Sequence, residues 1–186
     1  MPSLGIHVAI ARKYLKKYAD IKDEMAFIKW NLDPDLVDDK NISHYSRPCR
    51  EDELGDSLMS KVGIDEYLKN RDINTDYEKG YFLHLMADFY FYRGFLGKSY
   101  INNMSGEEFR KNLYYSYDVM GDYLERNYDI DYGASKIEVE KKIAESQTET
   151  NYGDGERMNI ISGAEVDEFI DWILEKDVDG WLREFI

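Results

Sequence analysis

Three histidines and a few aspartates have residue types and spacings that suit the binding of a metal ion. His84 and Asp88 are four residues apart in a strongly apolar stretch, and residues four apart lie on the same face of a helix. An imidazole and a carboxylate held side by side in this way can act as two ligands of one ion. The alternative is a core histidine hydrogen-bonded to Asp88, because an ionised aspartate in so apolar a helix needs a strong partner.

The other two histidines and one aspartate carry weaker signals. His7 lies early in a predicted amphipathic helix, where a lone histidine is more often a hydrogen-bonded core residue than a ligand. Asp35 follows Pro34 and precedes His44 by nine residues, a span that a loop can fold into a pair of ligands. Further aspartates crowd the same segment, so a solvated acidic loop is the alternative there.

Taken together, these candidates form one donor set of three imidazoles and two carboxylates: His7, Asp35, His44, His84 and Asp88. Such a set suits zinc, and also iron or manganese, better than calcium. The single cysteine, Cys49, excludes a thiolate cluster and an intramolecular disulfide, and it indicates a reducing compartment.

Helical periodicity dominates the segments that must position these residues. Apolar residues recur at helical spacing over 4–18 and 107–128, and Ser105 with Glu108 forms a capping-box pattern. The stretch 76–98 includes a segment that is apolar on every face, which predicts a central helix surrounded by others. Further helices are predicted over 54–68, with an interruption near Gly63, over 136–144 and over 164–176.

Loops are predicted over 30–39, where Pro34 and many acids occur, over 41–48 and over 147–155. We find no clean alternating strand pair, no internal repeat and no low-complexity tract in the sequence. We therefore expect an all-α, irregular multi-helix bundle with a metal site between helices. It should form a single domain over 1–186, with the metal-binding core in 1–100 and a helical second half in 101–186.

The charge of the chain limits its partners. The 186 residues carry a formal net charge of −14 and have a pI near 4.6, and the basic residues are scattered from Arg12 to Arg183. Such a surface repels nucleic acid and anionic membranes, so we expect no nucleic-acid duplex as partner. The sequence has no apolar run of membrane-spanning length and no signal-peptide pattern. We predict a soluble cytoplasmic protein with a small substrate, and its oligomeric state stays open.

The order of the candidate ligands resembles the zinc-dependent phospholipase C family and its relatives, the single-strand-specific zinc nucleases. The matching segments, all within 1–100, are Gly5-Ile6-His7, Asp33-Pro34-Asp35, Ser43-His44-Tyr45 and the run from Gly80 to Asp88. The resemblance implies a phospholipase C-like all-α fold, in which metal ions in a cleft between helices activate a water that hydrolyses phosphoester bonds. It also implies that Asp35, His44, His84 and Asp88 surround one ion, and that His7 joins a second ion that Asp88 bridges.

The chain departs from this family in two respects. Members with three ions carry further histidines and a glutamate downstream, whereas no histidine follows His84 here. The secreted members also use an amino group exposed by signal cleavage as a ligand, whereas this chain begins with Met1. We therefore expect one or two ions. Replacement ligands would have to come from acids in the second half, although solvated helix faces explain these acids more simply: Asp118, Asp122, Glu165 and Asp167.

These patterns predict a metal-dependent phosphoester hydrolase that acts on a small phosphorylated or lipid-derived substrate through a metal-activated water. Asp35 is the candidate general base, and Tyr45 or Arg47 is placed to contact the substrate. HD-type phosphohydrolases also place His and Asp on helical bundles, but their His-Asp dipeptide is absent from this sequence. The other alternative is a non-catalytic helical protein that a metal stabilises or that binds a partner. The role of 129–186 stays open.

Overall fold

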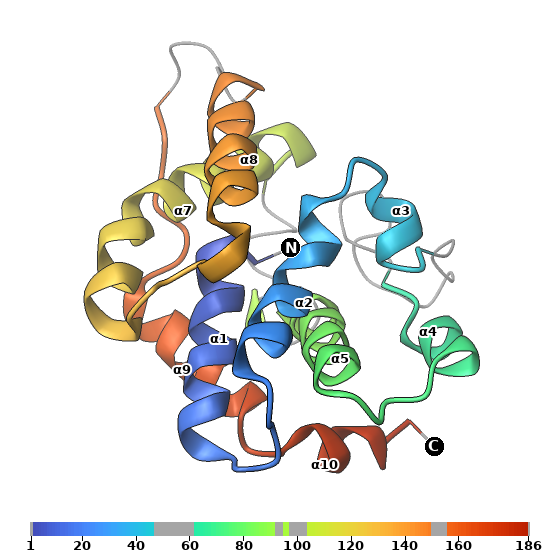
Figure 1. Ribbon diagram of the computed structural model, residues 1–186. Coiled ribbons are helices and arrows are strands. Elements are labelled where there is room, and N and C mark those ends of the chain that lie inside the picture. Colours follow the sequence, from blue (N-terminus) through green and yellow to red (C-terminus); the bar gives the residue numbers. More distant parts are fainter. Residues whose placement is uncertain (1, 47–61, 92–94, 97–103, 150–155, 186) are drawn as a thin grey trace.

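All regular secondary structure in the described part of the chain is helical (Figure 1). The computed structural model describes residues 2–46, 62–91, 95–96, 104–149 and 156–185, and no strand occurs among them. The α-helices are α1 (Leu4–Lys17), α2 (Glu24–Leu36), α3 (Lys40–Ser43), α4 (Ile64–Asn70), α5 (Asp76–Tyr90), α7 (Gly106–Tyr128), α8 (Lys136–Glu149), α9 (Gly163–Ile173) and α10 (Val178–Leu182). The prediction of an all-α bundle is confirmed. None of the described helices is both long and apolar enough to cross a membrane.

Helices α2 and α5 form the centre of the bundle and approach each other closely. Gly80 in α5 permits this approach, because a Cβ atom there would lie 2.2 Å from the carbonyl oxygen of Phe27 in α2. The side-chain amide of Asn31 in turn donates to the carbonyl oxygen of Gly80 at 3.1 Å. Every residue from Phe82 to Asp88 is buried, as expected for a central helix. The C-terminal half of α2 therefore lies against the face of α5 that carries the candidate ligands.

Helix α1 packs against both central helices and brings in a third candidate element (Figure 1). Its N-cap is Ser3, whose side chain accepts a hydrogen bond from the backbone of Ile6. The inward face of α1 buries His7 and Tyr14 completely. The imidazole rings of His7 and His84 stack with their centroids 3.9 Å apart, so α1 and α5 meet at the candidate ligands.

The prediction of a loop over 30–39 is wrong for most of its length, because α2 continues through Pro34 to Leu36. A proline removes one helical hydrogen bond and crowds the carbonyl four residues earlier. Pro34 is buried and lies only two residues before the end of α2. Because it is so close to the end, the backbone hydrogen bond that it cannot donate does not break the helix in its middle. Asp35 is thus fixed by a helix and not by a loop.

The predicted loop over 41–48 also needs correction. Its first residues belong to the short helix α3, which Asp39 caps by accepting from the backbone of Asn41. His44 is the C-cap residue of α3. Arg47, Pro48 and Cys49 lie outside the described residues.

The other helix predictions agree with the structure in the described residues, with changes at some ends. Helices α1 and α7 match the predicted ranges, and the Ser105 side chain accepts from the Glu108 backbone as the capping pattern predicts. Helix α8 extends to Glu149 and so enters the loop predicted over 147–155; residues 150–155 lie outside the described residues. The helix predicted over 164–176 already ends at Ile173, and α10 follows it.

Two predicted helices extend beyond the described residues. The helix predicted over 54–68 lies outside them up to residue 61, and α4 begins directly after Gly63. Helix α5 ends at Tyr90, before the predicted end at residue 98, and 92–94 and 97–98 are not described. The predicted central helix is therefore confirmed only for its N-terminal two thirds, which include both candidate ligands.

Candidate metal centre

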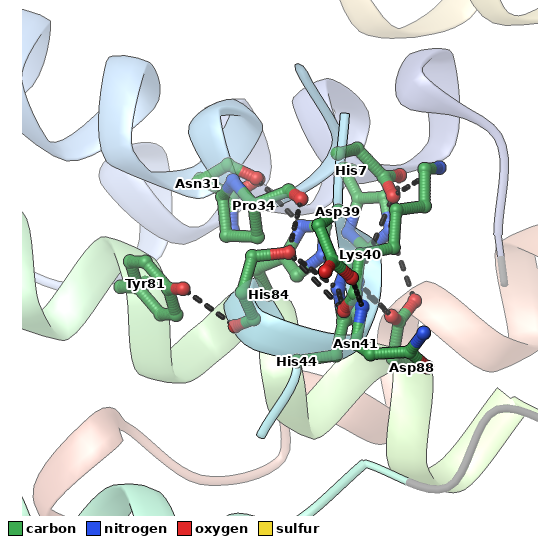
Figure 2. A network of polar contacts seen from close by, with 12 residues as sticks. His7, Asn31, Pro34, Asp39, Lys40, Asn41, His44, Tyr81, His84 and Asp88 are labelled. Carbon is green, nitrogen blue, oxygen red and sulfur yellow. Dashed lines mark hydrogen bonds and ion pairs between the residues drawn. The ribbon is translucent and has the colours of Figure 1, made fainter. Parts of the chain in front are cut away.

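The structure brings all five predicted ligands together in one buried cluster, and Figure 2 labels four of them: His7, His44, His84 and Asp88. His7 comes from α1, Asp35 from α2, His44 from the C-cap of α3, and His84 and Asp88 from α5. None of the five is more than 3 % exposed. Four separate elements thus converge on a single polar site inside an apolar core.

Asp88 lies at the middle of this cluster, and its two carboxylate oxygens face different histidines. Oδ1 lies 3.3 Å from His7 Nε2. Oδ2 lies 2.9 Å from His44 Nε2 and 3.6 Å from His84 Nε2. One carboxylate therefore contacts all three imidazoles of the chain.

Asp35 closes the cluster from the opposite helix. Its Oδ1 lies 3.6 Å from His44 Nε2, and its Oδ2 lies 3.9 Å from His7 Nε2. The same Oδ1 accepts from Lys40 Nζ at 2.7 Å. Asp35 is thus placed between the histidines and a lysine at the edge of the cluster.

The donor atoms have the spacing of a metal coordination shell. Two groups each offer three ligand atoms within 4.8 Å of one another: His7, Asp35 and His84, and His44, His84 and Asp88. Two ligands bonded to one zinc ion at about 2.0–2.1 Å lie about 3.3–3.4 Å apart in tetrahedral geometry. The observed separations of 2.9 to 3.9 Å bracket this value. The site could therefore hold a metal ion, and because His84 belongs to both groups the two sets are contiguous.

Backbone carbonyls orient two of the histidine rings. His84 Nδ1 lies 2.8 Å from the carbonyl oxygen of Asn31, and His44 Nδ1 lies 2.9 Å from that of Lys40. A carbonyl oxygen only accepts, so each Nδ1 carries the proton and each Nε2 presents a lone pair to the cluster. Metal-binding histidines usually have this arrangement, with the second ring nitrogen donating to a carbonyl or carboxylate.

The two inward nitrogens of His44 and His84 then create a conflict that a cation resolves. His84 Nε2 and His44 Nε2 are only 3.2 Å apart, and two neutral rings in this orientation oppose their lone pairs. Either a proton on one ring or a metal ion between them removes the repulsion. The pKa of His44 is accordingly raised: burial opposes the shift, but the hydrogen bond and charge of Asp88 and the charge of Asp35 outweigh it.

Several buried polar atoms of the cluster have no well-aligned hydrogen bond among the described residues. These atoms are both ring nitrogens of His7 and both carboxylate oxygens of Asp88. Buried polar groups in native proteins are nearly always satisfied, and exceptions call for an explanation such as an ion. A cation at the centre of the cluster would satisfy the inward-facing atoms of both residues.

Three of the shifted pKa values in the cluster favour the protonation states that a metal ion requires, whereas the raised pKa of His44 favours its protonated ring, whose proton a metal ion must displace. Burial, and next the charge of His7, lower the pKa of His84 to about 3, so its imidazole is neutral at pH 7. The pKa of Asp88 is lowered: burial opposes the shift, but His84, His44 and His7 outweigh it. The pKa of Asp35 is also lowered: burial and the charge of Asp88 oppose the shift, but His84, Lys40 and His7 outweigh them. Ionised carboxylates and a neutral imidazole are the ligand forms that bind metal.

The acids of the second half do not join this cluster. Asp118 and Asp122 are exposed on α7. Glu165 forms the capping box of α9 with Ser162, and Asp167 accepts hydrogen bonds from the phenols of Tyr123 and Tyr128. The proposal that these acids replace missing ligands is thus wrong among the described residues, and the plainer interpretation of Asp118 and Asp122 as solvated is right.

Tyr45, the predicted substrate contact, packs edge-on against Tyr67, with the ring centroids 5.3 Å apart.

Three residues that support the cluster were not predicted: Asn31, Lys40 and Tyr81. Tyr81 donates to the carbonyl oxygen of Ser43, and Ser43 Oγ donates to that of Pro34 at 2.8 Å. These two bonds fix the position of the neighbouring His44. Asn31 lies four residues before Asp35, so the helical spacing would have indicated it if Pro34 had not been taken as a helix breaker.

Comparisons of this chain with protein-family models, with curated proteins and with solved structures find no match. The resemblance to the zinc-dependent phospholipase C family therefore stays a prediction from short motifs. The metal centre is supported by the geometry of the cluster.

Proposed function

We propose that this protein is a metal-dependent hydrolase of phosphoester bonds that holds one or two ions of zinc, or of iron or manganese, in the His/Asp cluster. The observation that carries the proposal is the position of Asp88. Its two oxygens face His7 on one side and His44 and His84 on the other, so Asp88 would hold metal together with the histidines on both sides. A closed structural zinc site uses four protein ligands, so five donors shared between two ions would leave coordination positions for water or substrate.

The residues of the cluster would have different roles in such a site. A divalent ion bound there supplies Lewis acidity, which lowers the pKa of a bound water toward about 7 and offsets charge on phosphoryl oxygens. His84 and His44 keep their lone pairs aimed inward through their hydrogen bonds to backbone carbonyls. Asp35 is the general base. Because its pKa is lowered, its carboxylate takes a proton only from a water that is already acidified.

Hydrolysis of two simple substrates tests the proposal. Bis-p-nitrophenyl phosphate reports phosphodiesterase activity, and p-nitrophenyl phosphate reports phosphomonoesterase activity. We expect the zinc-loaded protein to hydrolyse at least one of them, and His84→Ala and Asp88→Asn to lose at least about a hundredfold of kcat/KM, which corresponds to about 2.7 kcal/mol. Asp33→Asn is the matched control, because Asp33 pairs with Lys29 on the surface of the same helix as Asp35.

A second candidate function is a structural metal site in a non-catalytic helical protein. The near-complete burial of all five ligands favours it, because structural sites are closed to solvent. The two functions differ in what the cluster variants lose. A structural site predicts that His84→Ala lowers the melting temperature strongly and that the zinc-loaded wild type hydrolyses neither substrate, a result that would contradict the hydrolase.

A further inference from the structure

Lys40 lies beside the buried cluster (Figure 2), and its side chain is partly exposed to solvent. Its Nζ atom donates to Asp35 Oδ1 at 2.7 Å, while 39 % of its side chain remains exposed. Among the described residues it is the one lysine or arginine that pairs with a cluster carboxylate. A single cation therefore lies where the buried donors meet the solvent.

Both ends of Lys40 are tied to the cluster. Its carbonyl oxygen accepts from His44 Nδ1 at 2.9 Å, and its ammonium group holds Asp35. A surface lysine normally samples many rotamers, so holding it in one conformation costs considerable entropy. The ammonium group of Lys40 is instead held at Asp35 Oδ1, the carboxylate oxygen that also faces His44.

The charge of the site explains why an anion would come to an acidic protein. Two carboxylates and the Lys40 ammonium together carry one net negative charge. One divalent ion makes this net charge positive by one, and two ions make it positive by three. With metal bound, the cluster would be a local positive site in a chain whose net charge is −14, and the partly exposed Lys40 would be its contact with solvent.

We propose that Lys40 binds the non-bridging oxygens of a phosphoryl group and so restricts the site to anionic phosphate ligands. An ammonium group has three N–H donors, and the bond to Asp35 uses one, so the others can bind phosphate oxygens. This inference rests on the proposed function, because it assumes that the cluster is loaded with metal. It adds the ligand class, a phosphate with at least two free oxygens, and the residue that recognises it.

Titration calorimetry with inorganic phosphate tests this role without reference to turnover. The zinc-loaded full chain is compared with Lys40→Gln, Lys40→Arg and the control Lys29→Gln, whose lysine pairs with Asp33 away from the cluster. We expect Lys40→Gln to weaken phosphate binding at least about tenfold, the loss expected for one charge-assisted hydrogen bond. Lys40→Arg should stay within about threefold of wild type, since the cation remains, and Lys29→Gln should match wild type.

Zinc content, measured on every sample, separates the possible failures. If Lys40→Gln keeps its zinc and binds phosphate as tightly as wild type, the role of Lys40 is refuted and the hydrolase proposal is untouched. If Lys40→Gln loses its zinc, Lys40 serves to position Asp35 and the phosphate contact is again refuted. A wild-type protein that takes up no zinc overturns both proposals.

Discussion

Replacing Asp88 with Asn is expected to remove most of the thermal stabilisation that zinc gives to this protein. Asp88 is the one ligand within ion-pair distance of all three histidines, with oxygens 3.3, 2.9 and 3.6 Å from their Nε2 atoms. Asparagine keeps the shape of the side chain but replaces one oxygen with an amide nitrogen, which does not bind a cation. The substitution therefore weakens the donor group that Asp88 forms with His44 and His84 and changes the volume of the core very little.

The expected size of the effect follows from ligand linkage. Zinc at 100 times its dissociation constant stabilises the folded protein by about 2.7 kcal/mol, and for a domain of this size that raises the melting temperature by about 5–11 °C. Changes of residues that only support a metal ligand cost up to about 100-fold in affinity, so a lost ligand should cost at least that factor. The same zinc concentration then gives about 0.4 kcal/mol, or about 1 °C.

Differential scanning calorimetry with and without zinc measures this shift for wild type, Asp88→Asn and the surface control Asp33→Asn. The zinc-induced shift is compared, since the substitution also changes the stability of the metal-free protein. We expect the full shift in wild type and in Asp33→Asn. An undiminished shift in Asp88→Asn would refute the assignment of Asp88 as a metal ligand.

Three further predictions follow from the packing and the pKa shifts. Gly80→Ala should lower the free energy of unfolding by at least about 2 kcal/mol, because its Cβ would collide with the α2 backbone. Gly121→Ala should raise the free energy of unfolding by about 0.5–1 kcal/mol, since a Cβ there meets open space. Urea denaturation measures both changes, and equal effects would contradict the close approach of α2 and α5. In metal-free protein the pKa of His84 is about 3 against its usual 6.5, so the unfolded chain takes up a proton that the folded chain does not. Stability therefore falls between pH 7 and pH 5 by about 2 kcal/mol more in wild type than in His84→Gln, and parallel urea profiles would contradict this pKa. Tyr81→Phe removes the hydrogen bond to the Ser43 carbonyl and should weaken zinc binding about tenfold in a chelator competition assay, whereas unchanged affinity would show that this bond does not position His44.

The sequence was most informative where a single helix sets the geometry. His84 and Asp88 share one face of α5 because they are four residues apart, and the apolar run around them predicts burial. Both features are local, so periodicity alone places these two side chains side by side. His7 on the inward face of α1 is predictable for the same reason.

The sequence was least informative where contacts between helices decide the site. Asp35 was expected in a loop because of Pro34. In the structure, α2 includes a buried Pro34 two residues before its C-terminal end, so Asp35 lies in the helix. The carbonyl of Asn31 reaches His84 only because Gly80 lets the two helices come close together. The ion pair of Lys40 likewise depends on how α3 folds back over α2. No periodicity in the sequence encodes these long-range contacts.

Elemental analysis of the purified, untagged protein tests the central claim most directly. Plasma mass spectrometry is applied to wild type, His84→Ala and Asp88→Ala after dialysis against zinc and then against metal-free buffer. We predict one or two zinc ions per wild-type chain and a loss of metal from both variants. A wild-type protein that retains no metal after this loading, or variants that retain as much as wild type, would contradict a metal centre in this cluster.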